Sequence, residues 1–463
     1  MKFLKYLFYT AFVGVMLVSC SKQIELAPTD TFTDINAFRT INDAQLGTNE
    51  AYARYGAYLN TIYTVSLITD EAKLGFDNSG QGAITYRYQS SSDAGDLNAA
   101  YGSYYFLIDQ VNRVLDKLPN VIATTTEEPR RNYIKAQLLA LRGISHFGLL
   151  QSFCKNYNAS EVKGVPIVLK SDILTQPKRN TMGEVMTQIE KDLSDASALL
   201  PAVTVSSFSD TTLNQVNIAA YRARIALYKG DYTAAINYAT TVISSVVKPL
   251  ATSANFPGIW TDANNMETLF RTRLANSTAL GGLFTTTGNL IYIAPSDKLV
   301  ASYAASDIRK STFIGGVATK YYLNKYFTSS RGGRIVDMKN CRISEMYLIR
   351  AEAYAKNTIP DLVSGTADLN TLRTQRISGY VNQIFATTAD LITAILDERY
   401  KELCFEGFRL FDLKRNGLSV QRNLSDVTST AWQTLATGDY KFILPIPQLE
   451  ILANPNMVQN DGY

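Results

Sequence analysis

Three glutamates near the C-terminal end have the residue type and spacing of groups that could catalyse a reaction. Glu398, Glu402 and Glu406 recur at every fourth residue, which would place them along one face of a helix. Paired carboxylates can act as general acid and base in glycoside hydrolysis. Ion-pair networks give the same pattern, and Arg399 and Arg409 lie close by in the sequence. We therefore predict that these carboxylates pair with arginines and stabilise the fold.

The single histidine is the other candidate for acid-base chemistry. His146 lies in the apolar stretch ALRGISHFGLL, with no second histidine in the chain and no cysteine pair nearby. No G-x-S-x-G, phosphate-binding loop or dinucleotide-binding glycine motif supports an enzyme class. We predict that His146 packs within a helix and that the protein is not an enzyme. Any two of the 41 acidic residues could still meet in space, so a hydrolase stays open as a minor alternative.

One cysteine follows an apolar run in a way that predicts a lipid anchor. The chain begins MKFLKYLFYTAFVGVMLVSC, where two lysines precede an apolar core in the order of a secretory signal. The residues Leu-Val-Ser lead directly into Cys20, as in a bacterial lipoprotein box. We predict a signal peptide over residues 1–19, lipid on Cys20 and a tether over residues 20–35. Acyl chains on one residue would hold a body comprising residues 36–463 to a membrane.

Charge and the other cysteines exclude several kinds of partner. The formal net charge is +4, of which Lys2 and Lys5 in the predicted signal contribute two. We see no basic stripe, and predict no nucleic-acid partner. Cys154, Cys341 and Cys404 are far apart in sequence, so we predict neither a zinc site nor a disulfide framework. No cofactor motif is present, and no later apolar run is long enough to cross a membrane.

Aromatic residues are the positive signal for binding, with 28 tyrosines, 20 phenylalanines and two tryptophans. Sugar rings stack on aromatic planes, and their hydroxyls pair with Asp, Asn, Gln and Arg. Two segments that break the helical pattern, 74–97 and 251–340, mix these residue types. Any one of their aromatic side chains could equally pack in the core. The candidate ligand-binding residues are Asp77, Asn78, Gln81, Tyr86 and Tyr88 in the first segment, and Trp260, Tyr292, Tyr303, Tyr321 and Tyr322 in the second.

The elements that must position these residues are helical. Amphipathic stretches predict helices that end at Pro119 and Pro201, with a third between them over RNYIKAQLLALRGISHFGLLQSF. The stretch NIAAYRARIALYKGDYTAAINYATTVISS predicts two short helices around Lys229, Gly230 and Asp231, as in a tetratricopeptide-type hairpin. SEMYLIRAEAYAKN and the following LVSGTADLNTLRTQRI form a looser second copy. Such hairpins must stack to bury their apolar faces. A plain helical array is the alternative interpretation.

An ordered set of motifs runs through the chain, most densely over residues 397–463. There, Glu-Arg is followed by Glu-Gly-x-Arg, Asp-Leu-x-Arg, Pro-Ile-Pro, Asn-Pro and Gln-Asn-x-Gly-Tyr. Upstream, LRGISHFGLLQSF precedes GVPIVL, RISEMYLIRAEAYAKN occupies 342–357, and Asn370 and Arg373 fall in Leu-Asn-x-x-Arg. In this order the motifs resemble those of the SusD/RagB family of lipoproteins.

The resemblance implies a fold and a role. The fold is mainly α, with about four tetratricopeptide-like hairpins as scaffold and an irregular, short-stranded portion that binds ligand. The role is that of a lipid-anchored, surface-exposed outer-membrane protein that binds oligosaccharide as the lid of a SusC-type TonB-dependent transporter. Peptide capture, as in some family members, is one alternative. An assembly lipoprotein that holds other proteins in its tetratricopeptide grooves is another.

Overall fold

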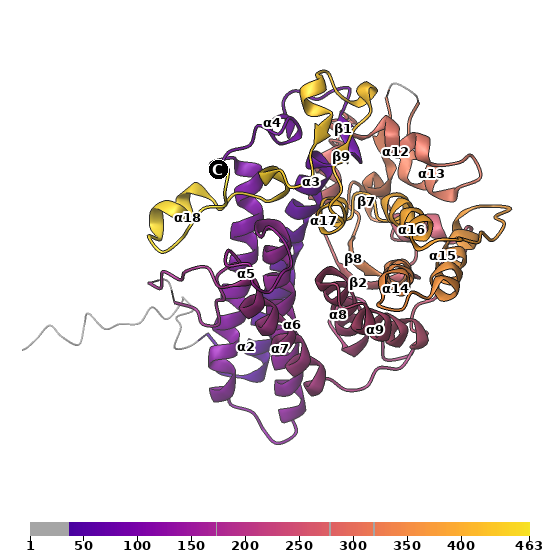
Figure 1. The fold of residues 1–463 in the computed structure, drawn as a ribbon. Coiled ribbons are helices and arrows are strands. Elements are labelled where there is room, and N and C mark those ends of the chain that lie inside the picture. The colour runs from indigo at the N-terminus through magenta and orange to yellow at the C-terminus, as the bar shows by residue number, and fades with distance from the viewer. Residues whose placement is uncertain (1–36, 173, 277–278, 318–319) are drawn as a thin grey trace, which may run out of the picture.

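The computed structural model describes residues 37–463, apart from 173, 277–278 and 318–319. The predicted signal peptide, Cys20 and the tether therefore lie outside the described residues. The body is mainly helical with short strands, as predicted (Figure 1). Within this part of the chain, none of the helices has the length and apolar content needed to span a bilayer.

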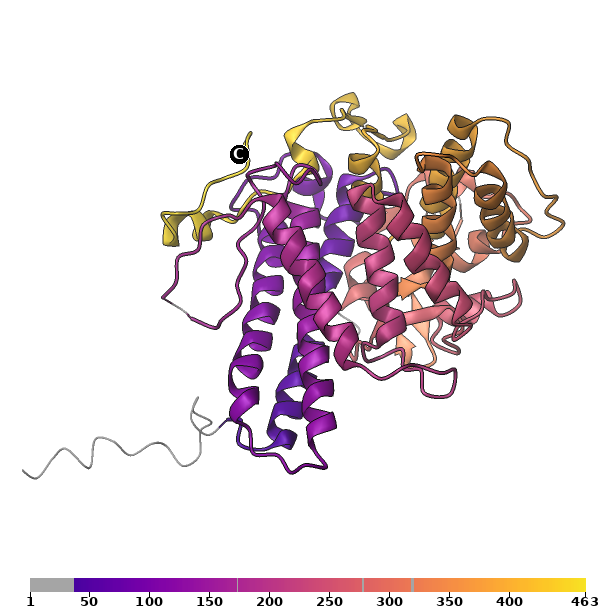
Figure 2. The same ribbon diagram turned by 60° about the horizontal axis from the view of Figure 1, so that its bottom comes forward.

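Long helices form the N-terminal half, and Figure 2 shows them side by side. The predicted stops hold, because α5 ends before Pro119 and α7 before Pro201. Thr40 and Thr181 begin α2 and α7 with capping boxes, which satisfy otherwise unpaired helix N–H groups. Helix α6 is buried almost continuously from Ile134 to Phe153 and forms the central helix of this half. The bounds are α2 (Ile41–Tyr55), α3 (Leu59–Ile68), α4 (Ala83–Tyr86), α5 (Gly95–Lys117), α6 (Glu128–Phe153) and α7 (Met182–Leu199).

Successive helix pairs continue the scaffold and confirm the tetratricopeptide-like interpretation. The predicted turn falls between α8 and α9, where Gly230 has a φ of +77° and Asp231 caps the second helix through the N–H of Ala234. Helix α14 packs on both α9 and α15. Helices α6 and α7 form the first pair. The later pairs are α8 (Gln215–Lys229) with α9 (Tyr232–Ser244), α14 (Ile343–Lys356) with α15 (Leu362–Arg376), and α16 (Thr388–Glu402) with α17 (Arg409–Arg415).

In its described residues, the segment 251–340 contains the predicted short strands and also four short helices. Strand β2 (Thr268–Thr272) pairs with β8 (Met338–Arg342) against the scaffold. Strand β1 (Ala72–Leu74) pairs antiparallel with β3 (Ile293–Pro295), with Leu74 opposite Ile293. The other elements are α10 (Phe256–Trp260), α11 (Leu280–Phe284), α12 (Asp297–Ser302), α13 (Ile308–Phe313), β4 (Ile314–Gly315), β5 (Tyr322–Leu323), β6 (Thr328–Ser329), β7 (Gly332–Gly333), β9 (Val420–Gln421), β10 (Thr434–Leu435) and α18 (Gln448–Ala453).

The three spaced glutamates lie inside the protein and pair with arginines, as predicted. Helix α16 ends at Glu402, however, so Glu406 lies in the turn that follows. The carboxylate of Glu402 accepts hydrogen bonds from Arg309 (3.2 Å), Arg342 (2.9 Å) and Arg376 (3.0 Å). Burial alone would raise its pKa, but the three guanidinium groups hold the pKa of Glu402 well below its ordinary value.

The arginines nearest to these glutamates in the sequence are not their partners. Arg399 pairs with Asp412 (2.8 Å), and Arg409 pairs with Asp70 (2.8 Å). An arginine next to a glutamate on a helix points about 100° away from it, so residues distant in the chain supply the partners instead. Glu398 pairs with Arg309 and Arg373, and Glu406 with Lys325 and Arg342.

Candidate functional site

The segments 74–97 and 251–340, predicted to break the helical pattern, contain short helices, and they meet in space through the β1–β3 pair. Beyond this pair, the Nδ2 of Asn78 donates to the carbonyl oxygens of Gln81 (2.8 Å) and Tyr292 (2.9 Å). One carboxylate oxygen of Asp77 accepts from the N–H of Ile291 (2.9 Å), and the Asp77 N–H donates to the Ile291 carbonyl (3.0 Å). The polar candidates of the first segment therefore fix it against the second.

Aromatic side chains extend this junction. Phe76, beside Asp77, is 63% exposed, and Tyr292 is half-buried. The ring of Tyr322 lies 4.3 Å from that of Phe327. It also lies directly over Gly315, where an added Cβ would come within 2.2 Å of the ring. We call the set the insertion surface: Phe76, Asp77, Asn78, Gln81, Tyr292, Tyr322 and Phe327. Phe76 and Phe327 were not among the candidate residues predicted from the sequence, although Phe76 lies in the first predicted segment and Phe327 in the second. The half-buried Tyr321 precedes Tyr322 in the chain.

Four candidate residues are enclosed by the protein and are not part of this surface. Tyr86, Tyr88, Trp260 and Tyr303 are buried. Tyr86 donates its hydroxyl hydrogen to the carbonyl of Asp426 (2.6 Å). Tyr303 donates to the carbonyl of Lys401 (2.8 Å), and Trp260 lies beneath the ammonium of Lys325 (4.0 Å). Their rings present no face to a ligand in this conformation.

A single buried arginine explains the burial of Tyr86 and Tyr88. The guanidinium of Arg422 stacks on both rings, 3.8 Å from the centroid of Tyr86 and 4.5 Å from that of Tyr88. Its N–H groups donate at 2.7–3.0 Å to five backbone carbonyls. These belong to Leu67, Ile68, Thr69, Tyr86 and Trp432. In Figure 1 the C-terminal segment (yellow) passes beside α3, α4 and β1 (indigo), where these contacts are made.

A buried carboxyl group lies immediately before β1, at the base of the insertion surface. Glu71 is fully buried, and the hydroxyl of Ser66 donates to one of its oxygens (2.8 Å). Its backbone carbonyl accepts from the N–H of Ser296 (2.9 Å), which extends the β1–β3 pairing. Burial raises the pKa of Glu71 to about 7, and the neighbouring Asp70 adds to the rise.

Replacing Glu71 with glutamine is expected to remove a pH-dependent loss of stability. The folded protein keeps the Glu71 proton up to about pH 7, whereas the unfolded chain releases it near pH 4.3. Because the folded state binds more protons in that interval, stability falls as the pH rises through it. Across this interval, the free energy of unfolding of the wild type should fall by on the order of 3 kcal/mol relative to that of Glu71→Gln. Urea unfolding of both proteins near pH 5 and near pH 8 measures the difference. A difference that does not change with pH would contradict this assignment.

The groups that could do other chemistry are built into the scaffold. His146 is buried within α6, its Nδ1 lies 3.0 Å from the carbonyl of Arg142, and burial lowers its pKa to about 4. The prediction of a packed helix residue is confirmed. Cys154, Cys341 and Cys404 are buried and free. Among the described residues, no group of three or more His, Cys, Asp or Glu side chains is arranged to hold a metal ion.

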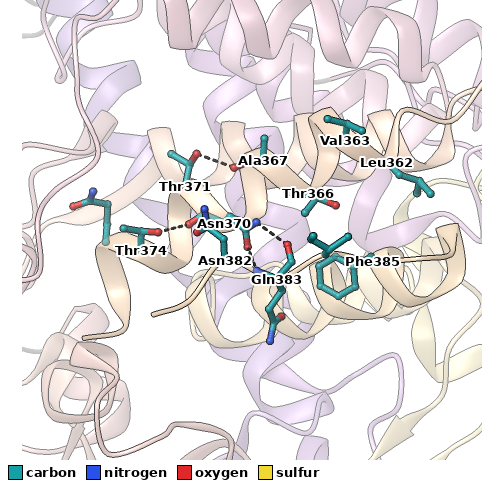
Figure 3. A pocket seen from close by; sticks show the side chains of 12 residues that line it. Leu362, Val363, Thr366, Ala367, Asn370, Thr371, Thr374, Asn382, Gln383 and Phe385 are labelled. Atoms are coloured by element: carbon teal, nitrogen blue, oxygen red, sulfur yellow. Dashed lines mark hydrogen bonds between the residues drawn. The ribbon is translucent and has the colours of Figure 1, made fainter. Parts of the chain in front are cut away.

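A second candidate surface, not predicted from the sequence, lies along α15. An open groove of about 710 Å³ runs along this helix and the segment that follows it, and none of its lining residues is charged. Figure 3 shows threonines of α15 opposite Gln383 and Phe385. The side chain of Asn370 exchanges hydrogen bonds with the Gln383 backbone, and Arg373 donates to the Gln383 side chain (2.6 Å). The Leu-Asn-x-x-Arg motif therefore holds the outer wall of this groove in place.

Family models match both ends of the chain. One described as "SusD family" matches residues 301–463. Another, described as "Starch-binding associating with outer membrane", matches residues 21–227. Helix pairs and parts of the insertion surface lie in both matched regions.

Individual relatives and solved structures are similar to the chain, three of them over more than nine tenths of its length. The SusD-like protein P2 of Formosa agariphila is 23% identical over 96% of this chain and 97% of its own length. The starch-binding protein SusD of Bacteroides thetaiotaomicron is 31% identical, over 27% of this chain and 22% of its own. A SusD superfamily protein from Bacteroides thetaiotaomicron superposes with a TM-score of 0.80 at 25% identity, covering 91% of this chain and 99% of that one. A SusD-like carbohydrate binding protein from Bacteroides vulgatus superposes with a TM-score of 0.77 at 21% identity, covering 91% and 98%.

Proposed function

The chain is a SusD-like protein of the SusD/RagB family, and from that premise we propose that it binds an oligosaccharide at the outer membrane and delivers it to a SusC-type TonB-dependent transporter. The insertion surface is the observation that carries the proposal. Exposed and half-buried rings there lie beside a carboxylate and two amide side chains, which is the mixture that sugar rings and hydroxyls require. Binding without catalysis is part of the proposal.

The anchor completes the proposed role. Lipid on Cys20 would hold the body at the membrane, and the tether over 20–35 would keep it concentrated beside the transporter while allowing it to move as a lid. The descriptions of the family model and of the Bacteroides thetaiotaomicron protein, which mention outer-membrane association and starch binding, support this location and ligand class. Exposure on the cell surface follows from the same role.

Replacing Phe76 with alanine is expected to weaken oligosaccharide binding about tenfold, because a stacked aromatic ring contributes about 1.4 kcal/mol. Phe106 offers a matched control, since it is 66% exposed on α5, outside the insertion surface. Isothermal titration of Phe76→Ala and Phe106→Ala with a panel of oligosaccharides and short peptides measures the difference. Equal affinities for the two variants would contradict the site. Binding of peptides alone would replace the oligosaccharide with a peptide ligand.

The groove along α15 favours a second candidate, an assembly role in which the helix pairs hold a partner protein. Val363, Val381 and Ile384 project beside it and are 80–92% exposed, which is unusual for aliphatic side chains gathered at one site. This candidate predicts that capture of a partner protein survives Phe76→Ala. The first candidate predicts that oligosaccharide binding does not.

A further inference from the structure

Two cationic side chains of the second segment, 251–340, lie at the edge of the insertion surface and have no carboxylate partner among the described residues. Neighbouring cations are paired: Lys325 with Glu406 (2.7 Å) and Arg331 with Asp262 (2.9 Å). Within the described residues, neither Lys320 nor Arg334 forms a salt bridge. The surface therefore holds positive charge that the fold itself does not balance.

Arg334 is the more unusual of the two, because it is only 8% exposed. Its guanidinium lies 4.2 Å from the ring centroid of Phe327, and one terminal nitrogen donates to the side-chain oxygen of Asn289. Its Nε is buried with no acceptor in the described structure. Burial lowers the pKa of Arg334, yet a guanidinium stays charged in proteins. A buried guanidinium is costly unless an anion is available to pair with it.

Lys320 lies at the opposite edge and is exposed. Its ammonium is 4.0 Å from the ring centroid of Phe76. Contact with an aromatic face leaves the N–H groups of a lysine free to donate to a ligand. A cation placed over one ring of the proposed stacking surface can therefore contact a sugar that lies on that ring.

The two cations belong to one continuous surface. Phe327, beneath Arg334, contacts the ring of Tyr322, which lies two residues beyond Lys320. On its other side, Arg334 donates to Asn289. Two residues further along the chain, the N–H of Ile291 donates to Asp77, which precedes Asn78 and follows Phe76 in the sequence. Asp77 supplies the one carboxylate of the insertion surface. Two cations against one carboxylate leave a net positive charge.

We propose that the ligand of the insertion surface is an acidic oligosaccharide, whose carboxylate or sulfate groups contact the exposed Lys320 and the outer edge of Arg334 while a sugar ring stacks on Phe76. This inference rests on the proposed function and narrows its ligand class. The aromatic face of Phe76 favours a sugar over an acidic peptide. The side-chain amide of Gln81, whose hydrogen bonds among the described residues go to Ser79, can also pair with ring hydroxyls.

Titration of the full chain in detergent with three matched probes tests the inference. The probes are a neutral galactan oligosaccharide, a homogalacturonan oligosaccharide with uronate carboxylates, and a carrageenan oligosaccharide with sulfate esters. We expect at least one acidic probe to bind at least about tenfold more tightly than the neutral one, with an affinity that falls as salt is added. Whichever acidic probe binds more tightly identifies the anionic group.

Substitution at the two edges locates the contact. Lys320→Gln should weaken binding of the acidic probe about fivefold and leave neutral binding unchanged. Lys310, an exposed lysine of the same insertion, provides the control Lys310→Gln, which should change neither. Arg334→Gln should weaken acidic binding further, and Lys320→Gln keeps the test valid if that variant does not fold.

The outcomes separate this inference from the function on which it rests. Neutral and acidic probes that bind equally, or a Lys320→Gln variant that matches Lys310→Gln, would overturn the acidic ligand and leave oligosaccharide binding standing. An oligoglutamate titrated as a fourth probe completes the test, and its binding with no oligosaccharide bound would overturn both in favour of an acidic peptide. No binding of any probe would also overturn both.

Discussion

Replacing Glu402 with glutamine is expected to destabilise the protein by about 3–5 kcal/mol, because it leaves buried guanidinium groups without their shared carboxylate. Arg309, Arg342 and Arg376 all donate to Glu402, and all four side chains are buried. Glutamine has the same shape, but it has only one oxygen that can accept hydrogen bonds and its amide carries no charge. Urea unfolding near pH 7 measures the change, provided that the variant refolds reversibly.

The same helix offers a matched control for this substitution. Asp397 lies one turn before Lys401, with which it forms an exposed ion pair (2.6 Å). Asp397→Asn makes the same chemical change at the surface and should cost less than about 1 kcal/mol. If Glu402→Gln were no more destabilising than Asp397→Asn, the buried network would not be essential to the fold.

Replacing Arg422 with lysine is expected to lower the free energy of unfolding by about 3 kcal/mol or more and to make the segment 74–97 less rigid. Lysine has three donors on one nitrogen and cannot reach the five carbonyls that the planar guanidinium bonds. Each lost hydrogen bond from a charged donor leaves a buried carbonyl unsatisfied. Urea unfolding gives the energy, and proteolysis within residues 74–97 should become faster than in the wild type.

Arg87 provides the comparison for Arg422. Its guanidinium lies 4.9 Å from the ring centroid of Trp432, in the same region. Arg87→Lys should cost less than about 1 kcal/mol, because a cation on an aromatic face is retained. Similar stability losses for Arg87→Lys and Arg422→Lys would show that the carbonyl contacts contribute little.

The sequence predicts best what depends on neighbouring residues. The helix ends at Pro119 and Pro201 and the hairpin turn at Gly230 follow from local steric rules, and the structure confirms them. Composition also identified the segments 74–97 and 251–340, which the structure joins through β1 and β3. These features require no knowledge of distant contacts.

Contacts between distant residues decided what the sequence could not show. Tyr86 and Tyr88 have the same local appearance as exposed tyrosines, and their burial depends on Arg422, more than 300 residues away. The spacing of Glu398 and Glu402 predicted ion pairs, but their partners come from residues 309 to 376. The α15 groove depends on the path of the chain after Arg376, which no periodicity describes.

The position of Arg422 near the end of the chain has a consequence for biosynthesis. A ribosome releases Leu67, Ile68 and Thr69 more than 350 residues before it adds the arginine that satisfies their carbonyls. Until then these three carbonyls lack the charged donor that satisfies them in the folded protein. A nascent chain that lacks its last 42 residues therefore cannot complete the packing of Tyr86 and Tyr88 on Arg422, and this part of the fold closes only when translation is nearly finished.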